Sequence, residues 1–253
     1  LYKYTFGFGD TAITSSDGQY AFIYQKLGTK GLLLKNGDIL REINRSYYCA
    51  EVYEYPAAFV TIDNRTFLVH CPMKYCRLDF EDVETGQIVT DDQDRNPSDY
   101  FHSRLEISPN GKYLMSKGWF WHPWNDIRLF DIRKCFDSPE ELDKSEIYPN
   151  VGTEICTASF IDENKVLIGS SDEEEMNDEL LENLPQKHIA IWDIELNQIS
   201  KPIKIQSEFG NLFAINEKFA WDLFKFPKII DLETGEIVDK DESLASGLQK
   251  SSI

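Results

Sequence analysis

The stretch 105-LEISPNGKYLMSK-117 places two strand-like runs on either side of a polar turn, which is the pattern of a β-hairpin. The same pattern recurs four more times along the chain. Its turn markers are Asp17, Asp63, Asn110, Glu163 and Glu217, which are separated by 46, 47, 53 and 54 residues. The other four copies are 12-AITSSDGQYAFIY-24, 58-AFVTIDNRTFLVH-70, 158-ASFIDENKVLIGS-170 and 212-LFAINEKFAWDLF-224.

A second strand pair follows each of these hairpins. Gly37, Gly86 and Gly235 supply glycine where a tight hairpin turn needs a positive φ. Four strands per repeat and a period near 50 residues are typical of the blades of a β-propeller. The second pairs are 32-LLLKNGDILREI-43, 76-CRLDFEDVETGQIV-89, 126-DIRLFDI-132, 188-HIAIWDIELNQI-199 and 227-PKIIDLETGEIV-238.

Several of these segments resemble the WD-repeat and related β-propellers, and the resemblance extends over nearly the whole chain. The segment 108-SPNGKYL-114 is similar to the first hairpin of such blades. The segments 191-IWDIE-195, 129-LFDI-132 and 230-IDLETGEIV-238 are similar to the third strand and its turn. The Gly-His dipeptide that opens a WD blade is absent, so the resemblance implies the architecture and no particular subfamily.

We therefore predict one all-β domain over residues 1–253, a five-bladed β-propeller of four-stranded antiparallel blades. The blades are expected at 10–45, 46–92, 100–150, 151–206 and 207–242, with residues 1–8 as a strand that closes the ring against the last blade. A closed ring would remove the exposed strand edges that promote aggregation. An open β-sandwich with irregular repeats is the alternative interpretation.

Composition narrows the classes of partner. The 253 residues include 44 acidic and 26 basic side chains, which gives a net charge of −18. Nucleic acids and anionic membranes need clustered Lys and Arg, so neither is expected as a partner, whereas a basic protein is. No apolar run reaches the roughly 20 residues of a membrane span. Five cysteines without regular spacing favour reduced thiols, so we expect a cytoplasmic protein. We also expect a monomer.

The aromatic stretch 117-KGWFWHPWND-126 lies between the second and third strands of the third repeat. Alternation along a strand would place Trp119 and Trp121 on one side and Phe120 on the other, so some of these rings could be core. Pro and Asn in 122-HPWN-125 favour a loop, which makes Trp124 a candidate exposed anchor. The candidate partner-binding residues of this loop are Trp119, Trp121, His122 and Trp124.

A second candidate binding segment is 171-SDEEEMNDELLENLP-185, in the corresponding loop of the fourth repeat. Ser171 and Glu174 form a capping box, and Pro185 closes a short acidic helix. Met176, Leu180 and Leu184 would form one apolar stripe. The helix lacks the Lys residues of an ordinary solvated helix, so its carboxylates are candidate partner-binding groups: Asp172, Glu173, Glu174, Glu175, Asp178 and Glu179.

No catalytic motif, metal site or cofactor site is evident. The four histidines are scattered, and no pair of Cys or His has zinc spacing. Five-bladed propellers include glycoside hydrolases, which use inward-facing carboxylates, and Asp79, Glu106 and Asp222 lie near strands. We keep a glycoside hydrolase or carbohydrate-binding protein as the alternative.

The main functional prediction is a non-enzymatic module that binds a basic protein through an acidic and aromatic loop face. Aromatic side chains would anchor the partner, and carboxylates would steer its approach. A scaffold of the WD-repeat kind and an inhibitor or immunity protein that neutralises a basic toxin both fit this prediction. We expect no metal, no cofactor and no catalysis.

Overall fold

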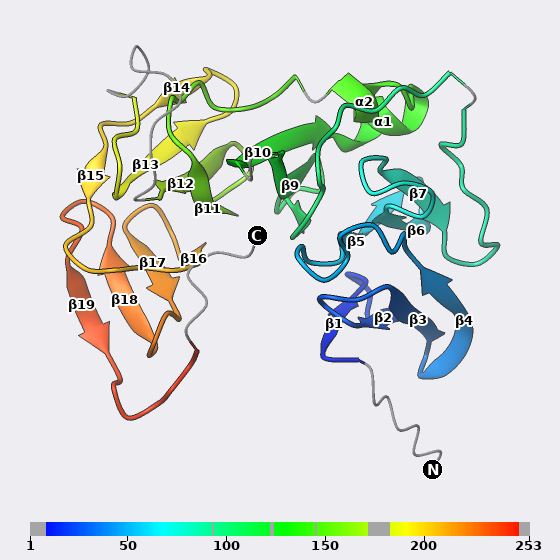
Figure 1. Cartoon of the computed structure of the whole chain (residues 1–253), viewed down its shortest axis with the longest axis horizontal. Coiled ribbons are helices and arrows are strands. Elements are labelled where there is room, and N and C mark those ends of the chain that lie inside the picture. Colours follow the sequence, from blue (N-terminus) through cyan, green and yellow to red (C-terminus); the bar gives the residue numbers. More distant parts are fainter. Residues whose placement is uncertain (1–8, 93, 122–123, 145, 172–182, 248–253) are drawn as a thin grey trace.

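A computed structural model describes residues 9–92, 94–121, 124–144, 146–171 and 183–247. This part of the chain folds into five antiparallel β-sheets that follow one another in chain order. The sheets lie along an arc, and the first and last sheets stand on either side of its open end (Figure 1). Strands β1, β5, β11 and β16 lie on the inner side of the arc, and β4, β14 and β19 on the outer side. The arrangement is propeller-like.

The first two sheets contain four and three strands. The first sheet has the order β1-β2-β3-β4, and the second has the order β5-β6-β7. Their strands are β1 (Thr11–Thr14), β2 (Tyr20–Tyr24), β3 (Lys30–Lys35), β4 (Asp38–Asn44), β5 (Ala57–Ile62), β6 (Arg65–His70) and β7 (Asp79–Asp82).

The third sheet has the order β10-β9-β8 and is followed by two short helices. The fourth has the order β11-β12-β13-β14 with β15 also paired to β13, and the fifth has the order β16-β17-β18-β19. These elements are β8 (Glu106–Ile107), β9 (Tyr113–Phe120), β10 (Trp124–Asp131), α1 (Ile132–Asp137), α2 (Glu141–Lys144), β11 (Ile155–Phe160), β12 (Lys165–Ser170), β13 (His188–Asp193), β14 (Gln198–Ile199), β15 (Ile203–Lys204), β16 (Leu212–Ala214), β17 (Phe219–Asp222), β18 (Lys228–Asp231) and β19 (Ile237–Lys240).

The prediction of four strands in every repeat is wrong for the second and third sheets, which have three strands each among the described residues. In the second sheet the place of a fourth strand is taken by a single bridge between Glu81 and Ile88. In the third sheet α1 begins directly after β10, and the Asp131 side chain caps it by accepting a hydrogen bond from the Lys134 amide. The chain returns to this sheet only at a bridge between Leu129 and Ile147.

Neighbouring sheets pack face to face. The fourth sheet shows this clearly, because Val166 and Trp192 pack toward the third sheet, whereas Leu167 and Ile189 pack toward the fifth. Side chains alternate between the two faces of a strand, so one sheet contributes to two successive cores. Contacts of β1 with β5, of β5 with β8 and of β11 with β16 continue this order along the inner side of the arc.

The predicted closing strand, residues 1–8, lies outside the described residues, so closure of the ring stays a prediction. Among the described residues no strand pairing joins the first sheet to the fifth. Residues 172–182, where the acidic helix was expected, also lie outside the described part. Leu184, the last member of its predicted apolar stripe, is buried against the core of the third and fourth sheets.

Two further predictions concern cysteines and membranes. All five cysteines lie in the described part of the chain, and none of them forms a disulfide. Within that part, no helix is both long enough and apolar enough to span a bilayer.

The packing between sheets makes a direct prediction for Leu167. Its side chain is fully buried in the core between the fourth and fifth sheets. Leu167→Ala should therefore lower the free energy of unfolding by about 2–5 kcal/mol, because it leaves a cavity. Leu196→Ala, at a leucine that is 65% exposed, should change it by no more than about 0.5 kcal/mol. Urea denaturation of the two variants measures the difference, and equal effects would contradict this packing.

Candidate functional site

A layer of buried aromatic residues lies where the connections after β4 and after β7 meet the end of β9. Trp119, near the end of β9, stacks on Phe101 with ring centroids 4.0 Å apart and ring planes at 3°. The two residues also exchange backbone hydrogen bonds of 2.9 and 3.2 Å. Tyr53 packs edge-to-face on Phe101 at 5.3 Å. These three buried residues, Tyr53, Phe101 and Trp119, form one cluster that we call the aromatic base.

Three further aromatic residues lie on this base and reach solvent. Trp121 is 46% exposed and packs edge-to-face on Trp119 at 5.5 Å. Tyr48 is 47% exposed and lies 6.4 Å from Trp121. Tyr75 lies 4.8 Å from Tyr48 and stacks on Phe101 at 4.4 Å. We call Tyr48, Tyr75 and Trp121 the aromatic patch. Because each ring rests on other rings, the patch presents apolar surface in a fixed arrangement.

Glycine at position 118 allows this close packing. A Cβ at Gly118 would lie 2.0 Å from the carbonyl oxygen of Phe101 and 2.8 Å from the ring of Tyr100. The Gly118 amide donates a hydrogen bond of 2.8 Å to the Tyr100 hydroxyl, which itself donates to the Asp126 carbonyl at 2.9 Å. A side chain at position 118 would push the segment of Phe101 away from β9 and open the aromatic base.

Arg45 holds the loop that carries Tyr48. Its guanidinium donates hydrogen bonds of 2.9 Å to the carbonyl oxygens of Ala50 and Tyr53, and of 2.7 Å to that of Gly28. The same group lies 4.3 Å from the ring centre of Tyr53, a cation–π contact. Burial lowers the pKa of Arg45 from its ordinary value. The loop after β4 is therefore fixed by a buried cation.

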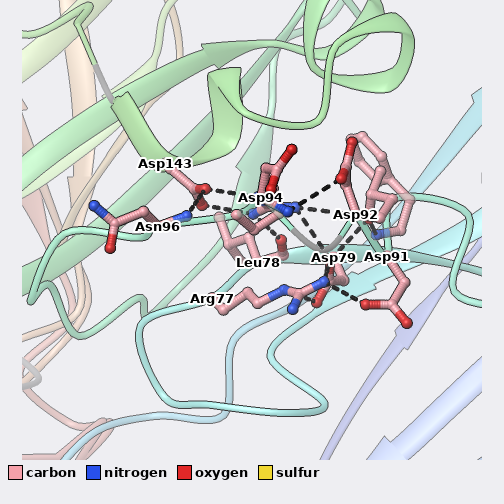
Figure 2. Close-up of polar contacts among 11 residues, drawn as sticks. Arg77, Leu78, Asp79, Asp91, Asp92, Asp94, Asn96 and Asp143 are labelled. Carbon is pink, nitrogen blue, oxygen red and sulfur yellow. Dashed lines mark hydrogen bonds and ion pairs between the residues drawn. The ribbon is translucent and has the colours of Figure 1, made fainter.

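A network of ion pairs around Arg95 holds the segment that leads to Phe101, and Figure 2 labels its members Arg77, Asp79 and Asp143. The Arg95 side chain is 1% exposed and makes ion pairs with Asp143 at 2.8 Å and with Asp79 at 3.2 Å. Asp79 is fully buried and also pairs with Arg77 at 3.0 Å. Burial raises the pKa of the Asp79 carboxyl, although Arg77, Thr90 and Arg95 act in the opposite direction. The network ties α2 and the segment 91–96 to β7.

The connection that contains this segment also supplies one carboxylate beside the aromatic patch. The hydroxyl of Tyr75 donates a hydrogen bond of 2.5 Å to Asp99, which is exposed. Asp91, Asp92 and Asp94 are also exposed and precede it on the same connection between β7 and β8. We call these four residues, Asp91, Asp92, Asp94 and Asp99, the acidic rim. Long-range steering by such a rim would favour a cation next to the aromatic patch.

The four aromatic-loop candidates occupy different positions. Trp121 lies on the exposed patch. Trp119 is 4% exposed, so it supports the patch from below and offers no contact surface. The expectation that Trp124 lies in a loop is wrong, because Trp124 begins β10, pairs with Phe120 and is half-buried. His122 lies outside the described residues. Backbone pairing of β9 with β10 continues to Phe120 and Trp124, and this pairing overrides the preference of Asn125 for a loop.

The acidic candidates Asp172, Glu173, Glu174, Glu175, Asp178 and Glu179 all lie outside the described residues. Ser171, the described residue that precedes them, is connected to the aromatic stretch through hydrogen bonds to Glu154. Glu154 accepts hydrogen bonds of 2.8 and 2.6 Å from the backbone and side-chain amides of Asn125. The Ser171 hydroxyl donates to the other oxygen of Glu154 at 2.8 Å. The acidic run therefore starts from a residue held beside the first residues of β10.

The three carboxylates of the glycoside hydrolase alternative lie on three different sheets. Asp79 is held by the Arg95 network, and Asp222 is fully buried against Lys228 at 3.0 Å. Glu106 pairs with Lys117 at 2.6 Å and accepts a hydrogen bond from the Phe160 amide. None of the three shares a partner with another in the described part of the chain. Within the same residues no cluster of three metal-ligating side chains is found.

Sequence reasoning missed Tyr48, Tyr75 and Phe101, which come from three separate connections between strands. A local signal existed only for Tyr48, in the exposed pair 47-YY-48. The polar run 92-DQDRNPSD-99 gives no sign in sequence of a buried residue, whereas the side chain of Arg95 in this segment is 1% exposed.

Comparison with known proteins gives the fold and no closer relationship. No protein-family model and no curated protein sequence matches the chain. Among solved structures, the chain is similar to dihydro-heme d1 dehydrogenase NirN in complex with DHE, with a TM-score of 0.54 and 13% sequence identity. The match covers 95% of this chain and 48% of that one, so the chain spans about half the length of its structural neighbour. This similarity supports a propeller-like fold; no WD-repeat family is identified.

The Arg95 network predicts a large effect of a single substitution. Arg95→Met leaves Asp143 without its buried cation and Asp79 with only one, so the free energy of unfolding should fall by about 3–5 kcal/mol. Arg133→Met is the control, because this arginine is 56% exposed and pairs with exposed aspartates, and it should cost at most about 1 kcal/mol. Adding Asp143→Asn to Arg95→Met should restore part of the loss. Chemical denaturation measures all three, and a small effect of Arg95→Met would refute the role of the network.

Acid should destabilise the fold through His102. Burial lowers the pKa of this histidine to about 3, although a hydrogen bond to the Cys76 backbone acts in the opposite direction. The unfolded chain takes up a proton near pH 6.5 that folded His102 does not accept until about pH 3, so stability is complete above this window and falls within it. The slope from this one group is at most about 1.4 kcal/mol per pH unit.

Urea denaturation between pH 7 and pH 4.5 tests this expectation. His102→Gln should lose that part of the slope relative to the unmodified protein, whatever its effect on stability at pH 7. Identical slopes in the two proteins would show that His102 is protonated in the folded state at these pH values.

Proposed function

We propose that the protein is a non-enzymatic binding module that docks a basic protein on the aromatic patch and the carboxylates around it. The observation that carries the proposal is that Trp121 and Tyr48, each nearly half exposed, stand on a fully packed aromatic base. Rings that are exposed to this degree contribute little to the stability of the protein's own core. Interfaces use such rings as anchors.

The rigidity of the support favours binding. Ordering of side chains and loops at an interface costs about 0.5–1.5 kcal/mol for each immobilised side chain. Stacking on Phe101 and Trp119, and the buried Arg45 and Arg95 beside their loops, order the patch before any partner arrives. More of the contact energy would then be available for affinity.

The charge around the patch indicates a basic partner. Asp99 of the acidic rim accepts a hydrogen bond from Tyr75, and Glu51 is exposed on the loop of Tyr48, whereas Lys74 is an exposed cation of the neighbouring loop. The acidic run 172–179 enters the proposal by its sequence alone. With a net charge of −18, the protein would attract a basic protein and repel acidic ones. An adaptor and an inhibitor of a basic toxin both use this chemistry.

The glycoside hydrolase alternative has less support. Two of its three carboxylates are fully buried in ion pairs with Arg77, Arg95 or Lys228, so they cannot reach a sugar without breaking those pairs. The two carboxylates of a glycosidase must flank one glycosidic bond, and these three lie on separate sheets with separate partners.

The test uses arrays of defined basic, acidic and neutral peptides, with oligosaccharides as a further class. We expect binding of basic peptides that weakens as salt rises. Trp121→Ala should lower affinity by about 2 kcal/mol, roughly 30-fold, mainly through faster dissociation. Replacing Asp172, Glu173, Glu174 and Glu175 by Ser should slow association and flatten its salt dependence.

Leu196→Ala is the matched control, because it removes an exposed apolar side chain far from the patch in sequence. It should leave binding unchanged, and neither variant should shift the melting temperature greatly. Binding to oligosaccharides or acidic peptides, or equal effects of Trp121→Ala and Leu196→Ala, would overturn the proposal.

A further inference from the structure

Arg45 is a buried cation that has no anionic partner in the described part of the chain. It is 4% exposed. Its hydrogen bonds all go to backbone carbonyl oxygens, those of Gly28, Ala50 and Tyr53, and none of these carries a formal charge. By contrast, the buried Arg95 pairs with two aspartates. Burial of an unpaired charge is far more costly than burial of a neutral group with its hydrogen bonds made.

Three buried donor groups at this cation have no hydrogen-bond partner among the described residues. They are Nη1 of Arg45 and the hydroxyls of Tyr53 and Tyr55. Both tyrosines are fully buried. The guanidinium carbon of Arg45 lies 4.3 Å from the ring centre of Tyr53 and 4.9 Å from that of Tyr55, so the two rings lie against the same group. We call Arg45, Tyr53 and Tyr55 the buried donor cluster.

The surroundings of this cluster supply no free negative charge. Burial raises the pKa of both tyrosine hydroxyls, although Arg45 acts in the opposite direction. Burial also raises the pKa of the neighbouring Cys71 thiol well above its ordinary value. These groups therefore stay protonated at neutral pH. Glu81, whose charge acts on Tyr55, is already paired with Arg41.

We propose that the buried donor cluster binds one small monovalent anion, such as chloride. Nη1 of Arg45 and the two hydroxyls would each donate one hydrogen bond to it, so all three unpartnered donors would be satisfied. The anion would also neutralise the guanidinium. A water molecule would satisfy the donors and leave the charge of Arg45 unbalanced, and a divalent anion would leave a net negative charge in the core.

This inference goes beyond the proposed binding of a basic protein and does not depend on it. The position of the cluster nevertheless gives the anion a structural role. Arg45 holds the loop that carries Tyr48, and Tyr53 belongs to the aromatic base. A bound anion would therefore stabilise the support beneath the aromatic patch, without contact to the partner.

Thermal unfolding at constant ionic strength tests the proposal, with chloride replaced stepwise by gluconate, an anion too large for a buried site. A ligand that binds only the folded state raises the melting temperature. Each tenfold rise in chloride above its dissociation constant should therefore raise the melting temperature by roughly 3–5 °C. The same titration with sodium formate distinguishes a halide from a small carboxylate, because the anion that fits the site gives the larger shift.

Tyrosine-to-phenylalanine variants remove the donors and keep the rings against Arg45. The double variant Tyr53→Phe, Tyr55→Phe should need at least about tenfold more of the anion for the same shift, because two hydrogen bonds to a charged group are lost. Tyr47→Phe is the matched control, since Tyr47 lies on the same loop and is 81% exposed. It should respond to the anion as the unmodified protein does. If the double variant does not fold, the two substitutions are measured singly.

Crystals grown in sodium bromide locate the anion directly, because bromide scatters anomalously. We expect a bromide ion within hydrogen-bond distance of Nη1 of Arg45 and of both hydroxyls. An ordered water at that position without anomalous signal would overturn the proposal. Equal melting temperatures in chloride, formate and gluconate at every concentration would do the same. An unchanged response of the double variant would place the anion elsewhere and contradict this assignment.

Discussion

A β-sheet with apolar residues on both faces must be covered on both sides, and this constraint organises the whole molecule. Two strands of the middle sheets are buried without alternation, since every residue of β7 and of β11 is buried. In the first sheet, at one end of the arc, β1 and β2 keep an alternating pattern. The exposure of a strand therefore differs with the position of its sheet in the arc. Sequence alone shows the apolar residues, and the position in the arc decides which of them are buried.

Packing of the second sheet against the third also creates the candidate site. The connections after β4, after β6 and after β9 end at the same edge of the fold, where their aromatic residues meet. Tyr53, Phe101 and Trp119 fill the space at this edge, and the rings above them have no room to be buried. The aromatic patch is thus a consequence of core packing that continues past the end of the sheets. Because Tyr53, Phe101 and Trp119 fill the buried layer, Tyr48 and Trp121 lie above it and are exposed to solvent.

The repeat could be predicted from sequence because its signals are local. The turn residue Asn110 accepts hydrogen bonds from the Ser108 hydroxyl and the Lys112 amide, and Asp17 makes the same pair of contacts with Ser15 and Gln19. Such turns are determined by a few neighbouring residues. Five antiparallel sheets and a propeller-like arrangement follow from the period of these turns. The order of exposure within the 117–126 stretch was also partly predictable, since Trp119 and Trp121 do lie on one side and Phe120 packs with Tyr100.

The missing fourth strands show where local reasoning fails. In the second sheet the Phe80 amide donates to the Thr90 hydroxyl, and Thr90 in turn donates to the buried Asp79. A side chain has taken the place of a backbone acceptor, and no strand pattern predicts that competition. Arg95 was equally hidden, because a charged residue between Asp94 and Asn96 in sequence gives no sign that it will be buried by α2 and β7.

Two kinds of exposed apolar surface remain on the described part of this protein, and their surroundings differ. The aromatic patch rests on buried rings, and its Tyr75 donates a hydrogen bond to Asp99, so the proposed partner would meet apolar rings beside a carboxylate. The exposed side chains Phe213 and Trp221 of the last sheet lie instead in one register row, on the face opposite to the core with the fourth sheet. The two surfaces share no residue, so a substitution on one leaves the other intact.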